Sequence, residues 1–276
     1  MPRKLEVVAP DTAPPVWAAL RNEAERAARE EPTLGSLLNA VILSHGTMGD
    51  ALSYQFARKI GDQELRAMSA REIAQEAFEA DPSILAAAEL DLKAVFERDP
   101  ACKGYVQPFL FFKGFLALQN HRIAHWLWTH SRETLAFYLQ SKGSEVYQVD
   151  IHPNARIGSG VFLDHGTGVV IGETAVVGDD VSMLHGVTLG GTGAERGDRH
   201  PKIGKGVLLG AGAKVLGNIT IGEYAKVASG SVVLKPVPKH CTAAGVPARI
   251  VNCPTCDEPA KTMDHTLADV VYDYVI

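Results

Sequence analysis

The sequence predicts an α+β protein in which an N-terminal helical domain is followed by a parallel β-helix. Residues from about 16 to 142 are rich in strong helix formers at helical spacings. From residue 151 onward, aliphatic residues recur at every sixth position, which is the period of hexapeptide β-helix repeats. We expect a helical domain over 1–146, a β-helix over 147–251 and an irregular, mobile tail over 252–276.

The helical half divides into several segments. An Ala/Glu/Arg-rich run covers residues 22–31, and Asp81-Pro82-Ser83 predicts a helix start because Pro is favoured in the first turn. The helix that follows is expected to reach Phe96. Residues 113–139 carry Leu, Ala, Trp and Phe three and four positions apart, and they predict one long helix or two. Much of this half is apolar on more than one side, which indicates a compact bundle or a surface covered by another subunit.

The second half follows a hexapeptide repeat. Its aliphatic positions are Ile151, Ile157, Leu163, Val169, Ile171, Val177, Met183, Leu189, Ile203, Leu209, Val215, Ile221, Val227 and Val233. Three hexads form one triangular coil, as in the eighteen residues from Ile171 to Leu189. Each coil can bury its aliphatic side chains only against its neighbours, so the coils must stack into a solenoid.

Two irregularities interrupt this repeat. It shifts by two positions between Val169 and Ile171, and it stops between Gly190 and Lys202. The longer interruption contains Gly197-Asp198-Arg199-His200. Loops held by a rigid scaffold are favoured places for binding and catalysis, and an Arg there can grip a carboxylate with two parallel bonds. The alternative is a solvated polar loop without a role.

Length, charge and hydropathy limit the possible functions. The 276 residues carry a net charge of −5, which provides no general attraction for nucleic acid or an anionic membrane. No apolar stretch is long enough to span a bilayer, and the N-terminus lacks the apolar core of a signal peptide. These features predict a cytoplasmic protein in a reducing compartment, with no nucleic-acid or membrane partner.

The four cysteines do not suggest a disulfide framework in a chain of this length. Cys253 and Cys256 have CxxC spacing without a second ligand pair nearby, and we expect two free thiols in the tail. Zinc binding between subunits is the alternative. Cys102 and Cys241 are expected to be small buried residues.

His165 is the strongest candidate for catalysis. It lies two positions after the core residue Leu163, on the outside of a coil, and Asp150 precedes it by fifteen residues, near the same corner. A carboxylate beside an imidazole fixes the tautomer and stabilises the protonated ring, as a general base requires. The alternative is a surface histidine near a structural carboxylate. His185 occupies the same hexad position one coil later, and without clear further ligands it favours a structural role over a metal site.

Several linked strings resemble the serine O-acetyltransferase family of hexapeptide-repeat acyltransferases. They are Arg98-Asp99-Pro100-Ala101, Lys113-Gly114-Phe115, His125-Trp126-Leu127-Trp128, Val149-Asp150-Ile151-His152-Pro153, Leu163-Asp164-His165, Gly172-Glu173-Thr174-Ala175, Thr188-Leu189-Gly190-Gly191-Thr192-Gly193, Gly197-Asp198-Arg199-His200-Pro201-Lys202 and Ala243-Ala244-Gly245-Val246-Pro247-Ala248-Arg249. The match covers roughly residues 80 to 251. It implies a left-handed β-helix and transfer of an acetyl group from acetyl-CoA to the hydroxyl of L-serine, in L-cysteine biosynthesis.

The resemblance also implies roles for individual residues. His165 would be the general base, oriented by Asp150. Arg199 and His200, delivered by the loop to the same region, would hold the serine carboxylate and help to stabilise the tetrahedral intermediate. Asp99, from the helical domain, and Asp164 would pair with the serine ammonium.

Acetyl-CoA would lie in a groove between coils, near backbone groups of Gly191, Ala211 and Ser229, and no metal is expected. Members of the family are typically homohexamers, built as dimers of trimers, and are inhibited by L-cysteine. Their C-terminal tail binds cysteine synthase, and this chain keeps the terminal Ile276 of that tail. His185 departs from the family, since relatives often have Gln there.

Two other functions fit parts of the sequence. A hexapeptide-repeat acyltransferase could act on homoserine or a sugar, although the pattern of Asp99, Asp164 and Arg199 favours an amino acid. A non-catalytic scaffold or metal-binding β-helix would use His165, His185 and His200 as ligands.

Overall fold

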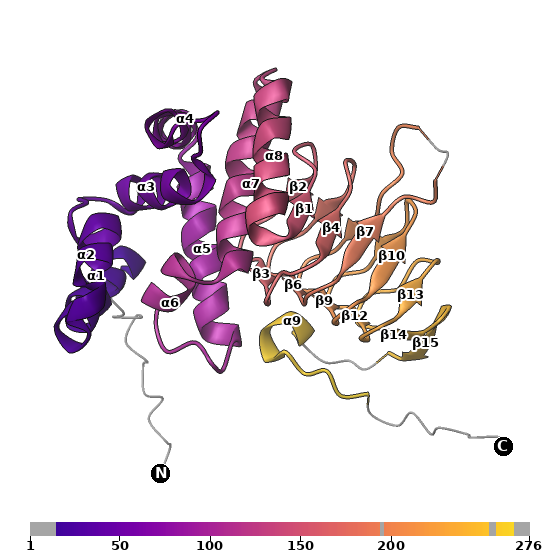
Figure 1. The fold of residues 1–276 in the computed structure, drawn as a ribbon. Coiled ribbons are helices and arrows are strands. Elements are labelled where there is room, and N and C mark those ends of the chain that lie inside the picture. Colours follow the sequence, from indigo (N-terminus) through magenta and orange to yellow (C-terminus); the bar gives the residue numbers. More distant parts are fainter. Residues whose placement is uncertain (1–14, 194–195, 254–257, 268–276) are drawn as a thin grey trace, which may run out of the picture.

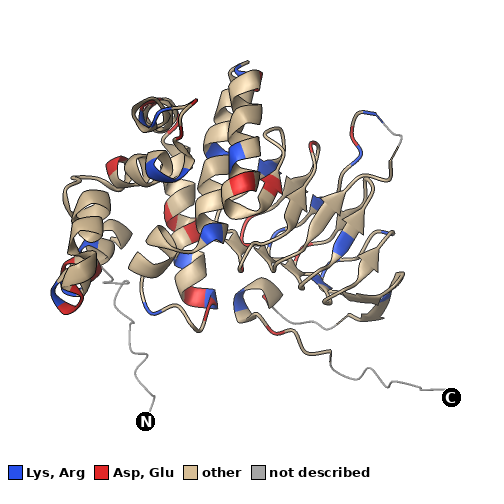
Figure 2. Cartoon of the chain, viewed as in Figure 1, with Lys and Arg blue, Asp and Glu red and all other residues tan. Residues whose placement is uncertain are grey.

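The fold, a computed structural model, has a helical part and a β-helical part that pack end to end (Figure 1). The structure describes residues 15–193, 196–253 and 258–267. Figure 2 shows acidic and basic residues interspersed over the described helices. None of the helices in the described ranges is both long and apolar enough to cross a membrane.

The helical part is a bundle with α7 at its centre. Its elements are α1 (Val16–Glu30), η1 (Pro32–Leu34), α2 (Gly35–Leu38), the π-helical η2 (Asn39–Leu43), α3 (Met48–Ile60), α4 (Ala67–Ala80), α5 (Ser83–Arg98), α6 (Val106–Leu110), α7 (Lys113–Thr129) and α8 (Glu133–Tyr147). The run expected to be one helix or two is two helices, because the chain turns at His130–Arg132 between α7 and α8. α5 begins where Asp81-Pro82-Ser83 predicts, and the Asp81 carboxylate accepts a hydrogen bond from Ser83 N at 3.0 Å.

The β-helix consists of three parallel sheets, one for each side of the triangular coil. Sheet A has the order β1 (Val149–Ile151), β4 (Val169–Ile171), β7 (Thr188–Gly190), β10 (Lys214–Leu216) and β13 (Val232–Val233). Sheet B contains β2 (Arg156–Ile157), β5 (Val176–Val177), β8 (Lys202–Ile203) and β11 (Thr220–Ile221). Sheet C contains β3 (Phe162–Leu163), β6 (Ser182–Met183), β9 (Leu208–Leu209), β12 (Lys226–Val227), β14 (Thr242–Gly245) and β15 (Ala248–Asn252), with β15 antiparallel. Most repeat positions are buried, which confirms the predicted parallel solenoid.

The register of the strands explains both irregularities of the repeat. Leu163 of β3 pairs with Met183 of β6, twenty residues later, whereas Ile171 of β4 pairs with Leu189 of β7, eighteen residues later. The two extra residues therefore lie in the turn between β3 and β4, which carries His165. The second irregularity is the loop between β7 and β8, which leaves sheet A and returns in sheet B. Both irregularities are extra residues at corners, and the strands on either side stay in register.

A buried ion pair joins the helices to the β-helix. The Asp91 carboxylate of α5 accepts hydrogen bonds from Arg122 Nε and Nη2 of α7 at 2.8 to 3.0 Å. It also accepts from Val161 N, before β3, at 3.0 Å, while Arg122 Nη2 donates to the Gly158 carbonyl at 2.7 Å. Close approach of α7 to the coil requires Gly114, since a Cβ there would lie 2.0 Å from the Leu163 carbonyl oxygen. These contacts fix the turn that follows Leu163 relative to the helices.

The structure corrects the prediction for Cys253. Cys241 and Cys253 form a disulfide, so Cys253 is not a free thiol, while Cys256 lies outside the described residues. The pairing arises because β15 folds back antiparallel to β14 and brings Cys253 beside Cys241, a contact that CxxC spacing does not reveal. Cys102 is a buried free thiol, as expected.

Part of the segment expected to be an irregular, mobile tail is folded. It contains the short helix α9 (Pro259–Thr262), and Ala260 within it is buried. The Ala260 carbonyl accepts a hydrogen bond from Ser182 Oγ of β6 at 2.8 Å. Met263 packs against a cluster formed by Ala94, Val95, Cys102 and Phe162. The segment therefore returns to the junction between the helices and sheet C.

Candidate active site

A pocket of about 560 Å³ lies between the end of α5, the start of α7 and the turn after β3. We call it the His165 pocket; Asp99, Asp164 and His165 line it, together with Phe112 and Lys113. Asp99 ends α5, and its Oδ1 accepts from Ala101 N at 2.8 Å. The structure therefore brings a helical-domain carboxylate beside the candidate base, in the arrangement that the resemblance implies for an ammonium-binding group.

His165 itself projects from a strained turn. Its backbone is left-handed, with φ of 57°, and its side chain is 76% exposed. Its Nε2 lies 3.7 Å from Asp164 Oδ1, a separation that permits electrostatic attraction but exceeds a hydrogen bond. A non-Gly residue in this backbone region costs free energy, so the turn holds His165 outward at the expense of local stability.

Burial raises the pKa of the Asp164 carboxyl, and the nearby Asp99 carboxylate raises it further. His165, His185 and His265 act in the opposite direction. Two carboxylates sharing one pocket repel each other when both are ionised, and a bound cation relieves this repulsion. The pair is therefore suited to an ammonium group.

This pKa predicts how serine affinity depends on pH. The resemblance implies that the ionised Asp164 carboxylate binds the serine ammonium. On that role, KM for serine is expected to rise as the pH falls through the pKa of Asp164, which is raised above the usual value of an Asp, about 3.9. Asp164→Asn should raise KM at neutral pH and remove this dependence, measured from initial rates at saturating acetyl-CoA. Glu76→Gln, which removes an exposed carboxylate of α4, is the control and should leave the profile intact. An unchanged profile in Asp164→Asn would contradict the assignment.

Asp150 is held elsewhere within the chain. It lies in the middle of β1, and its Oδ1 accepts from Gln140 Nε2 of α8 at 2.7 Å. Among the described residues, His165 makes no hydrogen bond to Asp150, and Asp164 is the carboxylate paired with it. The orienting role of Asp150 stays a prediction, and Gln140 is a partner that the sequence did not suggest.

The loop after β7 forms a second polar group, which we call the Arg199 corner. Arg199 Nη2 pairs with Glu173 Oε2 at 2.7 Å, and the Thr174 hydroxyl accepts from Arg199 N and His200 N at 3.0 and 3.1 Å. His200 Nδ1 accepts from Thr174 N at 3.2 Å, and the residue is only 7% exposed. Burial, followed by the charge of Arg199, lowers the pKa of His200. Glu173 and Thr174 therefore position the loop, and they belong to the Gly172–Ala175 string that marks the resemblance.

Within one chain the Arg199 corner and His165 do not share a site. His165 lies where the chain passes from sheet C to sheet A, whereas Arg199 and His200 lie where it passes from sheet A to sheet B. A strand and parts of two turns separate these corners by roughly 15–20 Å at the usual rise per residue. The expectation that the loop delivers Arg199 and His200 to His165 is therefore not met inside a single chain. The order of the hexads within each coil contains this separation. His165 follows the third hexad of a coil, whereas the loop follows the first hexad of a later coil.

The candidate acetyl-CoA residues divide between the same two corners. Ala211 and Ser229 follow His165 and His185 down the corner between sheets C and A, where Gly212 N donates to the His185 carbonyl and Gly230 N to the Ala211 carbonyl, both at 2.8 Å. Gly191 instead lies beside Arg199. Ala211 and Ser229 can therefore serve the same groove as His165, and Gly191 cannot do so within one chain.

His185 lies one coil below His165, with ring centroids 6.1 Å apart in a T-shaped arrangement. The metal-binding alternative needs His200 beside these two rings, but His200 is at the other corner. The residues that the structure describes contain no group of three or more His, Cys, Asp or Glu suited to a metal ion.

Comparisons with known proteins identify the family of this chain. Residues 16–120 match the family model for the N-terminal part of serine acetyltransferase, and residues 200–235 match that for bacterial transferase hexapeptide repeats. The serine acetyltransferase of Salmonella typhimurium is 54% identical over 249 residues, which cover 90% of this chain and 91% of that protein.

Solved structures of serine acetyltransferases are also similar to this chain in sequence and fold. A serine acetyltransferase in complex with cysteine has a TM-score of 0.90 and 51% identity, covering 91% of this chain and 98% of the other. The enzyme from Brucella abortus strain S19 in complex with coenzyme A has a TM-score of 0.87 and 51% identity, covering 89% and 98%. At this identity and coverage, the chain belongs to the serine acetyltransferase family.

Proposed function

We propose that His165 is the general base with which this serine acetyltransferase moves the acetyl group of acetyl-CoA to the hydroxyl of L-serine. The observation that carries the proposal is the His165 pocket, which presents an exposed imidazole beside two carboxylates. Asp99 and Asp164 bind the serine ammonium, and this places the hydroxyl near the imidazole. A homoserine or sugar acceptor is less well matched, because homoserine is one carbon longer and a sugar offers no ammonium.

In this mechanism His165 takes the hydroxyl proton while the serine oxygen attacks the thioester carbon. The tetrahedral intermediate then collapses, breaking the carbon–sulfur bond. The proton held by His165 goes to the departing thiolate, and O-acetylserine and CoA result. Ala211 and Ser229 would line the path of acetyl-CoA along the same corner. That a relative from Brucella abortus was solved in complex with coenzyme A supports the choice of acetyl donor. The transfer of the acetyl group from acetyl-CoA needs no metal ion in this scheme.

We further propose that a second copy of the chain completes the site. Serine also carries a carboxylate. The His165 pocket already contains two carboxylates, those of Asp99 and Asp164. Arg199 offers the matching cation but lies at the other end of the sheet A strands. Val170, on β4 between the two corners, is 39% exposed although it is a large aliphatic residue. Packing sheet A against neighbours around a three-fold axis would cover Val170 and bring the Arg199 corner of one copy to the His165 pocket of the next. Two such trimers would form the expected hexamer.

Mixing two inactive variants tests the shared site. His165→Asn and Arg199→Ala should each be nearly inactive when assayed well below the KM for serine. After co-expression at equal levels, about a quarter of the sites should combine an intact His165 with an intact Arg199 from the next copy, and activity should return to about that fraction of wild type. The control is the double variant His165→Asn/Arg199→Ala co-expressed with inactive His165→Asn, which cannot form an intact site. Activity no greater than the sum of the separate variants, in a verified mixed assembly, would contradict sharing.

L-Cysteine is the proposed feedback inhibitor. It carries the same α-ammonium and α-carboxylate as serine, so the groups proposed to bind serine would bind it too. The relative solved in complex with cysteine supports this proposal. Competition with serine, and not with acetyl-CoA, is the expected pattern.

Cysteine synthase is the proposed protein partner, bound through the C-terminal tail. The tail ends in Ile276, which lies outside the described residues. Deleting Ile276 is expected to abolish binding in a pull-down or by calorimetry while leaving acetyl transfer unchanged, since the tail end would contribute no catalytic group. The matched control replaces Met1 by a tagged N-terminus, which should bind normally. Undiminished binding after the deletion would exclude insertion of the tail.

We also propose a cytoplasmic location for this protein. The Cys241–Cys253 disulfide is unusual for the reducing compartment that this location implies.

A further inference from the structure

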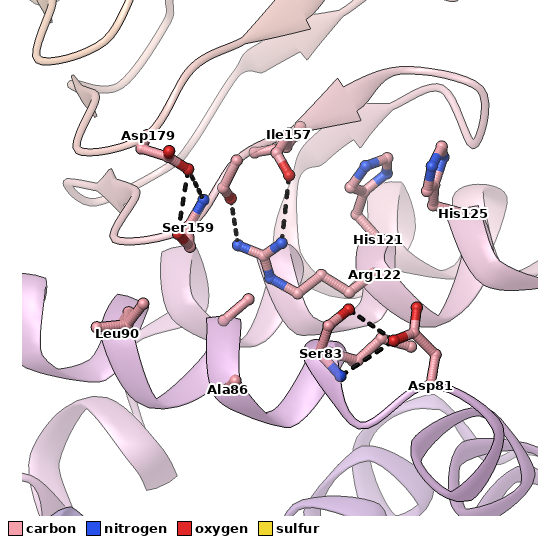
Figure 3. Close-up of a pocket in the computed structure, with 13 residues that line it drawn as sticks. Asp81, Ser83, Ala86, Leu90, His121, Arg122, His125, Ile157, Ser159 and Asp179 are labelled. Carbon is pink, nitrogen blue, oxygen red and sulfur yellow. Dashed lines mark hydrogen bonds between the residues drawn. The ribbon is translucent and has the colours of Figure 1, made fainter.

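Helix α5 has a pocket at each end. A pocket of about 540 Å³ lies at its start, where Asp179 Oδ1 accepts from Ser159 N at 2.8 Å (Figure 3). At the other end, Val95 in the last turn of α5 lines the His165 pocket, together with Asp99 directly after the helix. The C-terminal segment with α9 returns to the fold at this second end (Figure 1). Its contacts therefore connect the C-terminal segment with the proposed serine site.

Arg98 joins the end of α5 to sheet C and, through it, to the C-terminal segment. Its side chain is 3% exposed, and its Nη1 donates to Ser182 Oγ of β6 at 3.2 Å. Ser182 Oγ in turn donates to the Ala260 carbonyl of α9 at 2.8 Å. Because Arg98 directly precedes Asp99, two hydrogen bonds link α9 to the residue next to the Asp99 carboxylate.

Apolar contacts follow the same route. Met263, directly after α9, packs against the cluster that contains Val95 and Phe162, and both of these side chains line the His165 pocket. α9 has only four residues, and an isolated helix of that length is not stable in water. Its stability therefore depends on docking against α5 and β6, and undocking would remove a support of the pocket wall.

The Cys241–Cys253 disulfide fixes the point from which this segment leaves the β-helix. Cys253 follows β15, an edge strand in which residues 249–251 are exposed, so burial contributes little to holding the strand on β14. Only the five residues 254–258 connect Cys253 with the start of α9. When the disulfide is broken, β15 can detach from β14, and the connection to α9 then includes β15 and doubles in length.

The disulfide is open to attack at one of its two sulfur atoms. Cys253 is exposed, whereas Cys241 is only 4% exposed. A thiolate attacks Cys253 Sγ, the sulfur–sulfur bond breaks, and Cys241 leaves as a thiolate that takes up a proton. The second thiol of a dithiol then releases Cys253, so the pair gains two electrons and two protons while the dithiol becomes a disulfide. Disulfides in a reducing cytoplasm are usually transient and redox-sensing.

We propose that the Cys241–Cys253 disulfide is a redox switch for the serine site. In the oxidised state the short connection keeps α9 docked, and the docked helix holds Arg98 and Asp99 in place. Reduction by a dithiol releases β15, lowers the fraction of molecules with α9 docked and raises KM for serine. The effect on KM rests on the proposed role of Asp99, whereas the undocking of α9 does not.

Hydrogen exchange and kinetics on the full-length protein test the proposal, with dithiothreitol as the reductant and its cyclic oxidised form to restore the bond. Doubling the length of a loop disfavours its closure by about threefold. Reduction should therefore raise KM for serine about three- to tenfold and leave kcat nearly unchanged. It should also speed exchange at residues 261–263, whose amides donate within the segment. Loss of the acetyl-CoA thioester absorbance gives the rates, because the reductant itself carries thiols.

The two measurements separate the switch from the acetyl transfer. Unchanged exchange after reduction verified by mass spectrometry overturns the switch, whatever the kinetics show. Faster exchange with an unchanged KM overturns the link between α9 and the serine site. Neither result bears on whether serine accepts the acetyl group, which the same assay reports by its dependence on serine.

Variants assign the response to one pair of cysteines. Cys253→Ser, at an exposed position, should behave like the reduced protein and ignore dithiothreitol. Cys256→Ser is the matched control and should respond like wild type. Ser182→Ala removes the hydrogen bond to Ala260 and should raise KM for serine in both redox states, with the disulfide still formed. A response that persists in Cys253→Ser or disappears in Cys256→Ser, or an unchanged KM in Ser182→Ala, would overturn the proposal.

Discussion

Replacing His165 by Asn is expected to lower kcat for serine-dependent release of CoA by about 10²–10⁴-fold, the usual contribution of a general base. Asn is preferred to Ala because the backbone φ of 57° lies in the left-handed region, which Asn tolerates. The loss should therefore come from the missing imidazole and not from a rearranged turn. KM for acetyl-CoA should change little, because the imidazole acts on the other substrate. Thiol release at saturating substrates provides both constants.

His240→Asn is the matched control for this variant. His240 also has φ of 57°, lies in another turn of the β-helix and stacks on Tyr224. Its replacement tests whether loss of any histidine from a left-handed turn impairs the enzyme, and kcat should remain near that of wild type. Full activity of His165→Asn would remove His165 as the base, although the family assignment would stand on the other evidence.

Replacing Arg122 by Met is expected to lower the free energy of unfolding by about 3–5 kcal/mol, because it leaves the Asp91 carboxylate buried without its cation. The Asp91 side chain is fully buried and that of Arg122 nearly so. Met has a similar length and keeps most of the packing, so the change isolates the charge. Chemical denaturation at a fixed protein concentration provides the measurement, since assembly also contributes to apparent stability.

Lys93→Met provides the comparison with an exposed ion pair on α5, the helix that carries Asp91. Lys93 pairs with Glu89 at 3.7 Å, and both side chains are exposed. Its loss should cost no more than about 1 kcal/mol. The double variant Asp91→Leu/Arg122→Met should be more stable than Arg122→Met alone, because it removes the unpaired charge. If Arg122→Met lowers the free energy of unfolding no more than Lys93→Met does, the Asp91–Arg122 pair does not hold the helices and the β-helix together.

Much of the fold follows from local patterns. The hexads place aliphatic side chains inside each coil, and burial of Val169, Leu189 and Val215 confirms it. Asp81-Pro82-Ser83 predicts the start of α5 because a side-chain acceptor and a Pro suit the first turn. These predictions succeed because the hydrogen bonds and burial concerned lie within a few residues or repeat at a constant period.

The features that the sequence did not reveal depend on segments distant in the sequence. The Cys241–Cys253 disulfide forms because β15 runs antiparallel to β14. The CxxC spacing does not predict this pairing. Gln140 binds Asp150 because α8 packs beside β1. Arg199 was expected near His165; within one chain the two corners lie at opposite ends of the sheet A strands, and the meeting of the two residues stays a prediction that requires a second copy.

The sequence by itself determined the solenoid, the helical start positions, the family and the identity of the candidate base. The strand register, and not the sequence alone, places the two-residue shift of the repeat in the turn that projects His165. Only the tertiary structure decided which side chains line the pocket with Asp99 and Asp164, that Gln140 binds Asp150, and that α5 carries a second pocket at its far end. The physical reason is that period and capping are local properties of the chain. The meeting of side chains from α5, α7 and the coils depends on how those elements pack, through contacts such as Gly114 on Leu163 and Asp91 on Arg122.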